Sequence, residues 1–276
     1  MDENTLKSIS NALKKISYKT RREKIRAILV YHGVSDQEQK NCVPVLEFEN
    51  HLKYLLDTFS VISLDTFIDA LNNKADSDDN YVVLTFDDGY RNFYKHAYPL
   101  LVKYNLPAGL FVPSKLLNKY NSWDFGVTPG YSKLEIMNEK ELNELDPSLI
   151  EIGAHSATHP IMSELNDEDL AIEIRNSKKH LTEILKREVK HFAYPYGGLN
   201  HFDVRAKILV KNAGYRSASS THFGRFNSLT DLYSMKRISI WDNDTVIDLK
   251  NKLNGYYDWL AFKEKLIFNI KSFSIR

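Results

Sequence analysis

The sequence is poor in cysteine, in net charge and in long apolar runs. Its 276 residues include one cysteine, Cys42, which excludes an internal disulfide and any metal site built from several thiolates. The formal net charge is only +1, whereas a dedicated nucleic-acid binder usually carries a strong basic excess, so we expect no nucleic-acid partner. No segment approaches the roughly 20 apolar residues of a membrane-spanning helix. These absences leave a chain long enough for one large domain with a substantial core.

The N-terminal region has no apolar run that resembles the core of a signal peptide, which predicts a cytoplasmic protein. Basic residues dominate 7–26, where Glu23 is the only acidic residue. Apolar residues recur there at helical spacing: Leu6, Ile9, Leu13 and Ile16. We therefore assign 1–25 to a basic amphipathic helix and 26–276 to a catalytic domain. Such a helix either makes peripheral contact with an anionic membrane surface or packs on the domain as a solvated helix.

Short apolar segments alternate with amphipathic ones along the rest of the chain, which predicts an α/β fold with parallel strands. Strands are expected at 27–31, 61–64, 81–86, 108–112, 150–154, 191–194, 215–219 and 237–241. Helices are expected at 167–186, from Leu46 onward, at 90–104 and, as a docking helix, at 256–273. No repeat or Gly/Ser linker divides this region, so a single domain is predicted.

The expected strand 81–86 is followed by two carboxylates and a glycine, Asp87, Asp88 and Gly89. Active sites of parallel α/β folds gather at the C-terminal ends of strands. Neighbouring residues at a strand end point in opposite directions, so one carboxylate can face a metal and the other a substrate or water. Taken alone, the segment is better explained by an ordinary Asp-Gly turn.

The expected strand 150–154 is followed by two histidines, His155 and His159. On one turn of helix, this spacing places both imidazoles on the same face. Two imidazoles and one carboxylate form a three-ligand divalent site with an open position, which is typical of catalytic zinc. For the two histidines taken alone, a surface helical turn is an equally good explanation. Their combination with Asp87 and Asp88 favours a metal site.

Two further strand ends carry candidate residues. The first expected strand runs into His32, which is either a catalytic group or a histidine hydrogen-bonded at a strand end. The strand 191–194 runs into Pro195-Tyr196-Gly197-Gly198, a tight turn suited to exposing a backbone N–H beside a ligand.

Together these segments resemble the polysaccharide deacetylases of carbohydrate esterase family 4. Residues 85–89 are similar to the first motif of that family, 155–159 to the second and 193–197 to the third, and the likeness spans about 27–241. The resemblance implies a distorted (β/α) barrel with about seven parallel strands. It also implies a metal-dependent hydrolase that removes an N-acetyl group from an amino sugar, usually with zinc (Zn²⁺) as the single divalent ion.

The resemblance assigns roles to individual residues. Asp88, His155 and His159 would be the metal ligands, and Asp87 would be the general base for a metal-bound water that acts as the nucleophile. The backbone N–H of Tyr196 would stabilise the oxyanion.

Two positions depart from the family pattern. Many members carry an arginine where Ala193 stands here, and the late Leu-x-His motif that supplies the general acid is not evident. The sequence is more similar to the branch whose chain opens with a Tyr-His strand, as in the biofilm poly-N-acetylglucosamine deacetylases. That branch implies His32 as the general acid and Arg237 as the partner of Asp87, with His222 as a rival acid.

The expected substrate is an N-acetylated sugar, an oligosaccharide, or a lipid- or nucleotide-linked precursor. An O-acetyl sugar esterase and a non-catalytic carbohydrate-binding pseudoenzyme remain as alternatives. Aromatic side chains either stack on sugar faces or are buried in the core. The candidates are Tyr31, Trp123, Tyr194, Tyr196 and Trp241.

Overall fold

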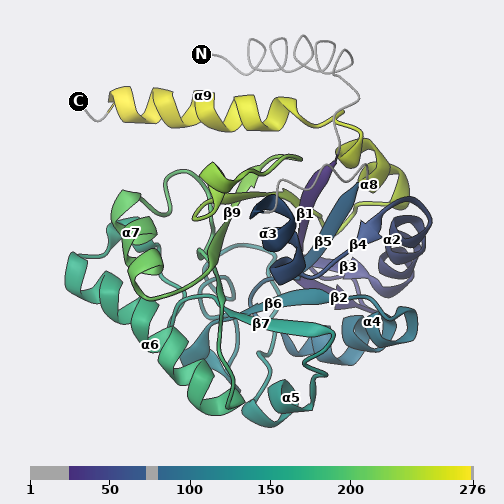
Figure 1. The fold of residues 1–276 in the computed structure, drawn as a ribbon, viewed down its shortest axis with the longest axis horizontal. Helices are drawn as coiled ribbons and strands as arrows, with labels where there is room; N and C mark the ends of the chain where they lie inside the picture. The colour runs from purple at the N-terminus through teal and green to yellow at the C-terminus, as the bar shows by residue number, and fades with distance from the viewer. Residues whose placement is uncertain (1–24, 73–79, 275–276) are drawn as a thin grey trace.

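Seven parallel strands close into a barrel in the order β1, β5, β6, β7, β8, β9, β10 and back to β1 (Figure 1). The computed structural model describes residues 25–72 and 80–274. The barrel strands are β1 (Arg26–Tyr31), β5 (Tyr81–Phe86), β6 (Ala108–Val112), β7 (Ile150–Ala154), β8 (His191–Ala193), β9 (Ser217–Phe223) and β10 (Met235–Ser239). The predicted distorted (β/α) barrel with seven parallel strands is therefore confirmed.

The pairing between strands is regular on one side of the barrel and irregular on the other. β1 pairs with β5 over six consecutive residues, from Arg26 opposite Tyr81 onward, and β6 pairs with β7 over five. By contrast, β7 and β8 share one pair, and the register between β9 and β10 shifts between Met235 and Arg237. This irregularity is the distortion of the barrel.

Helices surround the strands, as Figure 1 shows for α2, α4, α5, α6 and α7. The helices are α2 (Val45–Thr58), α3 (Leu64–Asn72), α4 (Tyr98–Tyr104), α5 (Glu139–Glu144), α6 (Asp167–Leu185), α7 (Val204–Asn212), α8 (Val246–Leu253) and α9 (Trp259–Ser274). Among the described residues, no helix is long and apolar enough to cross a membrane. The larger apolar core lies between these helices and the strands.

A second, smaller core fills the barrel itself. It joins alternate strand residues with the apolar face of α3, including Leu64, Phe67 and Ile68. Side chains alternate between the inside and the outside of a barrel wall, so these strand residues point inward. They are Ile28, Val83, Phe111, Ala193 and Met235. α3 thus closes the end of the barrel at which the strands begin.

One predicted strand is much shorter in the structure, and one predicted helix contains an irregular turn. The strand at 61–64 is reduced to β4 (Ser60–Val61), because α3 begins at Leu64 with the Ser63 hydroxyl accepting a hydrogen bond from the Thr66 N–H. The predicted helix at 90–104 is present as a continuous helical segment from Arg91 to Tyr104, but its middle part, Phe93–Ala97, is a π-helical turn that leads into α4. Pro99 falls in the first turn of α4, directly after the π-helical turn.

Of the two predicted terminal helices, the structure describes only the C-terminal one. The docking helix at 256–273 corresponds to α9, whose Leu260 and Ala261 pack against the core and whose Glu264 accepts a hydrogen bond from the Phe223 N–H. The predicted basic helix at 1–25 lies outside the described residues except for Ile25. Its membrane contact, the domain division at residue 26 and the cytoplasmic location therefore stay predictions.

Candidate active site

The sequence motifs meet at one end of the barrel because they all follow parallel strands. Asp87 and Asp88 follow β5, His155 follows β7, and the turn containing Tyr196 follows β8. The strands pair directly or through one neighbour, so their C-terminal ends lie on the same rim.

The turn after β5 separates the two carboxylates. The Asp87 N–H donates to the Tyr31 carbonyl at 3.0 Å and extends the pairing of β5 with β1. Asp88 and Gly89 then adopt left-handed conformations with φ of 70° and 61°. A non-glycine residue occupies this region at a cost, and such strain concentrates at functional sites. The turn directs Asp87 toward Arg237 and Asp88 toward two histidines.

Asp88, His155 and His159 form a buried cluster. The Asp88 Oδ1 atom lies 3.4 Å from His155 Nε2 and 3.3 Å from His159 Nε2, and one ligand atom from each residue lies within 4.8 Å of the others. His155 Nδ1 is 2.8 Å from the Ala193 carbonyl oxygen, which leaves Nε2 facing Asp88. One carboxylate and two imidazoles, one of them oriented by a carbonyl, suit a divalent metal such as zinc.

The two histidines lie on a loop, so the predicted helical turn is wrong. Ser156 and His159 have φ of 59° and 63°, and the His159 N–H donates to the Ser156 hydroxyl at 2.9 Å. Residues in this conformation do not continue a right-handed helix. The His159 ring stacks on Trp123 with a centroid distance of 4.0 Å and an interplanar angle of 18°. The loop, rather than helical spacing, brings both imidazoles to Asp88.

Electrostatics within the cluster favour an ionised ligand carboxylate. Burial alone raises the pKa of Asp88, but hydrogen bonds from His155 and His159 lower it to well below its usual range. Burial opposes the charged form of His155, and the neighbouring Asp87 and Asp88 reverse this effect, so the pKa of His155 is raised. Burial lowers the pKa of His159. A deprotonated carboxylate is the form that binds a metal ion.

Asp87 forms a buried two-point ion pair with Arg237. The guanidinium donates to both carboxylate oxygens, at 2.8 and 2.6 Å, and neither side chain is more than 2% exposed. Arg237 also donates to the Ser220 carbonyl at 2.8 Å and to the Thr85 hydroxyl at 3.2 Å. Burial raises the pKa of Asp87, but the charge of Arg237 outweighs it and holds the pKa below its usual value. Arg237 thus makes the contact with Asp87 that the family resemblance implied.

The turn after β8 presents a free backbone donor. Tyr196 and Gly197 are both left-handed, with φ of 59° and 64°. A Cβ on Gly197 would lie 2.6 Å from the Thr221 backbone nitrogen, so this close approach requires glycine. Among the described residues, none accepts a hydrogen bond from the Tyr196 N–H. The Tyr196 ring packs edge-on against His159 at 4.9 Å.

Comparison with known proteins agrees with this geometry. The model of the polysaccharide deacetylase family matches residues 74–218, more than half of the chain. The chain belongs to the polysaccharide deacetylase family. A putative polysaccharide deacetylase of Bacillus subtilis, YxkH, is 25% identical over 214 residues, which cover 77% of this chain and 70% of that protein. A poly-β-1,6-N-acetyl-D-glucosamine N-deacetylase of Staphylococcus aureus strain MRSA252 is 27% identical over 240 residues, covering 83% and 78%.

Solved structures of deacetylases share the fold. The Streptococcus pyogenes deacetylase PplD superposes with a TM-score of 0.69 at 24% identity, covering 84% of this chain and 98% of PplD. IcaB from Ammonifex degensii gives a TM-score of 0.70 at 18% identity, also covering 84% and 98%. This family member therefore has the barrel fold found in these proteins.

The two candidates for the general acid have different surroundings. His32 directly follows β1 and is partly exposed, and its positive charge helps to lower the pKa of both Asp87 and Asp88. His222 lies in β9, and its Nδ1 is 2.5 Å from the Glu264 carboxylate on α9. The charge of His32 therefore acts on both aspartates, whereas the His222 ring is hydrogen-bonded to Glu264 on helix α9.

One carboxylate near the candidate site, Asp124, was not predicted from the sequence. Burial and then the charge of Asp88 raise the pKa of this half-buried residue to about 6. It follows Trp123 in an irregular segment, and a lone aspartate in such a segment carries no recognisable signal.

Two of the aromatic residues proposed for sugar stacking are core residues. Tyr31 and Tyr194 are buried, with their hydroxyls bonded to His51 Nδ1 and to the Tyr233 carbonyl. Tyr196 and Trp241 keep 37% and 44% of their surface exposed, so they are available to a ligand.

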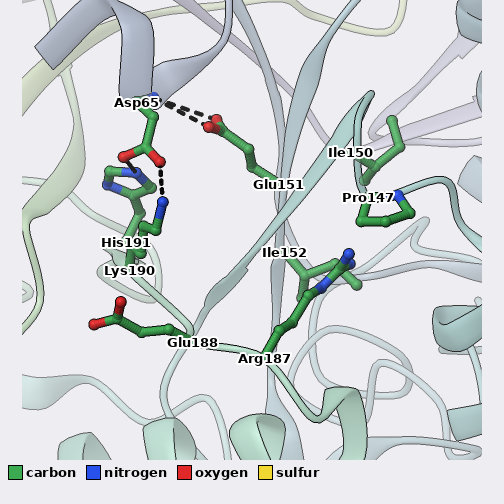
Figure 2. Close-up of a pocket in the computed structure, with 9 residues that line it drawn as sticks. All are labelled: Asp65, Pro147, Ile150, Glu151, Ile152, Arg187, Glu188, Lys190 and His191. Carbon is green, nitrogen blue, oxygen red and sulfur yellow. Dashed lines mark hydrogen bonds and ion pairs between the residues drawn. The ribbon is translucent and has the colours of Figure 1, made fainter. Parts of the chain in front are cut away.

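A second group of possible metal ligands lies at the opposite end of the barrel, beside a cavity of about 280 Å³ (Figure 2). It consists of Asp65, Glu151 and His191. Glu151 accepts hydrogen bonds from the Leu64 N–H at 2.7 Å and the Asp65 N–H at 3.2 Å. Asp65 is paired with His191, Lys190 and Arg216. Protein donors already satisfy both carboxylates, so this group stabilises the fold.

Proposed function

We propose that this family member is a zinc-dependent carbohydrate N-deacetylase that hydrolyses the acetamide of an N-acetylated amino sugar. The observation that carries the proposal is the pairing of the Asp88–His155–His159 cluster with a separate, arginine-bound carboxylate, Asp87. A ligand set and an adjacent base are both needed for hydrolysis, whereas a sugar-binding protein needs neither. The N-deacetylase activity named for the Staphylococcus aureus relative supports an N-acetylated glycan as the substrate class.

Asp88, His155 and His159 would hold the metal ion. When bound there, zinc supplies Lewis-acid polarisation of the acetyl carbonyl and lowers the pKa of a water molecule. Asp87 accepts the proton of the attacking water on a carboxylate oxygen, and Arg237 keeps that carboxylate ionised and oriented between turnovers.

Two other groups complete the reaction. The Tyr196 N–H donates a hydrogen bond to the oxygen on which negative charge develops, a contact typically worth about 3 kcal/mol in the transition state. His32, in its protonated form, donates a proton to the departing nitrogen, because an amine is a far better leaving group than its anion. The exposed faces of Tyr196 and Trp241 are suited to stacking on sugar rings.

The test is hydrolysis of N-acetylglucosamine oligomers by the zinc-loaded protein, with acetate and free amine measured together. We expect both products in equal amounts. Asp87→Asn should retain zinc and lose about 10²- to 10⁴-fold in kcat, since it removes the general base. Asp88→Ala should lose zinc.

Each alternative predicts a different result in the same assay. An esterase would release acetate from O-acetylated sugars and leave the N-acetyl oligomers intact. A pseudoenzyme would bind oligomers without releasing acetate. Undiminished turnover by Asp87→Asn would remove Asp87 from its proposed role.

A further inference from the structure

One carboxylate of helix α6 holds the loop that carries His155 and His159. The Glu173 Oε2 atom accepts hydrogen bonds from the Ala157 N–H and the Thr158 N–H, each at 2.8 Å. Its Oε1 atom accepts from the Thr158 hydroxyl, also at 2.8 Å. One turn further along the same face of α6, the Ser177 hydroxyl donates to the Ser156 carbonyl at 2.8 Å. Four hydrogen bonds therefore join α6 to the three residues that separate the two histidines.

His159 depends on this loop more than His155 does. The His155 ring is oriented by the bond from its Nδ1 to the Ala193 carbonyl. Among the described residues, none bonds to the buried Nδ1 of His159. The stacking of its ring on Trp123 and the left-handed backbone at its own Cα are what orient it. The position of His159 Nε2 is therefore set largely by the backbone of 155–159.

We propose that Glu173 is a positioning residue for the metal centre: its carboxylate holds the backbone of 157–158 so that His159 Nε2 faces Asp88. Two successive backbone N–H groups directed at one anion form a strong, directional arrangement. Outer contacts that orient metal ligands commonly change metal affinity by 10- to 100-fold when they are lost. The inference rests on the proposed function, since it takes the cluster to bind a metal ion.

The test measures metal affinity directly. Cobalt(II) is titrated into metal-free protein, and the absorption of the bound ion is followed in competition with a chelator. Glu173→Ala should raise the Kd for cobalt by about 10-fold or more. Glu183→Ala, at an exposed position on the same helix, is the matched control and should leave the Kd unchanged.

Thermal unfolding separates positioning from a purely structural role. A structural role would lower Tm equally with and without metal. A bound metal ion stabilises the folded state according to its affinity. If Glu173 positions His159 for the metal, saturating metal should therefore raise Tm less in Glu173→Ala than in the wild type. If Glu173→Ala fails to fold, two milder variants replace it: Glu173→Gln, which keeps one acceptor oxygen, and Ser177→Ala. Both should bind cobalt more weakly than the wild type.

The outcomes for the two proposals are distinct. A wild-type protein that binds no cobalt contradicts the metal centre and hence the proposed function. A wild type that binds cobalt, together with folded Glu173 variants of equal affinity, overturns the role of Glu173 alone.

Discussion

Asp87 and Asp88 are neighbours in the chain but have different chemical surroundings. Asp87 is bound at both oxygens by Arg237, whereas Asp88 faces two imidazole nitrogens. The difference arises from the left-handed conformation of Asp88, which turns the chain immediately after β5. Two carboxylates with different environments can perform different functions at one pH, and here we assign proton transfer to one and metal binding to the other.

A comparison of two histidine variants tests the assignment of the general acid. His32→Ala should lower kcat by about 10²-fold or more, because it removes the group that protonates the departing nitrogen. His222→Ala should have a much smaller effect, since its ring is bonded to Glu264 on α9. The measurement is kcat on an N-acetylated oligomer, with zinc content determined for each variant. A larger loss of kcat in His222→Ala would transfer the role to His222.

At the scale of elements, the loops after the strands carry the strained backbone. Of the eight non-glycine residues with positive φ in 25–72 and 80–274, four lie in the candidate site, so strain is concentrated there. They are Asp88, Ser156, His159 and Tyr196. Each conformation costs on the order of 1–3 kcal/mol and persists only if surrounding contacts hold it. The hydrogen bonds from α6 to the loop 155–159 are contacts of this kind.

Helix α3 illustrates how one element begins through contacts with another. The Ser63 hydroxyl accepts from the Thr66 N–H, and Glu151 on β7 accepts from the Leu64 and Asp65 N–H groups. The free N–H groups of its first turn are thereby satisfied.

Loss of the Glu151 carboxylate should destabilise the protein. We expect Glu151→Ala to lower the free energy of unfolding by about 1–2 kcal/mol, comparable to the loss of a helix cap. Urea unfolding measures this change, with Glu188→Ala, an exposed residue beside the same cavity, as the control. Zinc content should not change in either variant. Loss of zinc in Glu151→Ala would contradict the structural role given to this cluster.

At the scale of the whole molecule, the barrel divides its charged groups between two ends. The candidate site lies where the strands end, and the ion pairs of Asp65 lie where they begin. Between them lies the apolar filling of the barrel, to which α3 contributes. Substitutions at one end of the barrel should therefore change catalysis, and substitutions at the other end should change stability.

The ion pairs of Asp65 should make stability depend on pH. The hydrogen bond from His191, followed by the contacts with Lys190 and Arg216, lowers the pKa of Asp65 well below its usual value despite partial burial. The unfolded chain has a pKa near ~3.9 at this residue. Because the folded pKa is depressed, the contribution of Asp65 is fully present above the unfolded pKa and is lost as pH falls toward the folded one.

Urea unfolding of the wild type and Asp65→Asn between pH 3 and 7 tests this dependence. We expect the wild type to be more stable near neutral pH and the difference to shrink below about pH 4. The metal ligands are common to both proteins, so the difference reports Asp65 together with the groups paired to it, His191 included. A difference that stays constant over this range would show that Asp65 acts without its charge.

The sequence by itself determined the fold class and singled out Asp87, Asp88, His155 and His159, whose roles stay predictions. Apolar runs marked β5, β6 and β7 at the bounds that the structure has. Parallel strands end on one rim, so the motifs that follow them had to meet. The local pattern of the sequence was enough to predict these features, because hydrophobic periodicity and the identity of the residues after a strand are local properties.

Only the tertiary structure decided which distant side chains meet. Glu173 binds a loop on a neighbouring element, and no pattern in the sequence pointed to this contact. Arg237 reaches Asp87 across 150 residues, a contact that the family resemblance implied but that no local pattern shows. The loop conformation at 155–159 also differs from the helical turn that spacing alone suggested. These contacts depend on strand register, on where helices pack and on backbone conformations held by remote hydrogen bonds. None of these is a local property of the sequence, so tertiary packing alone determines them.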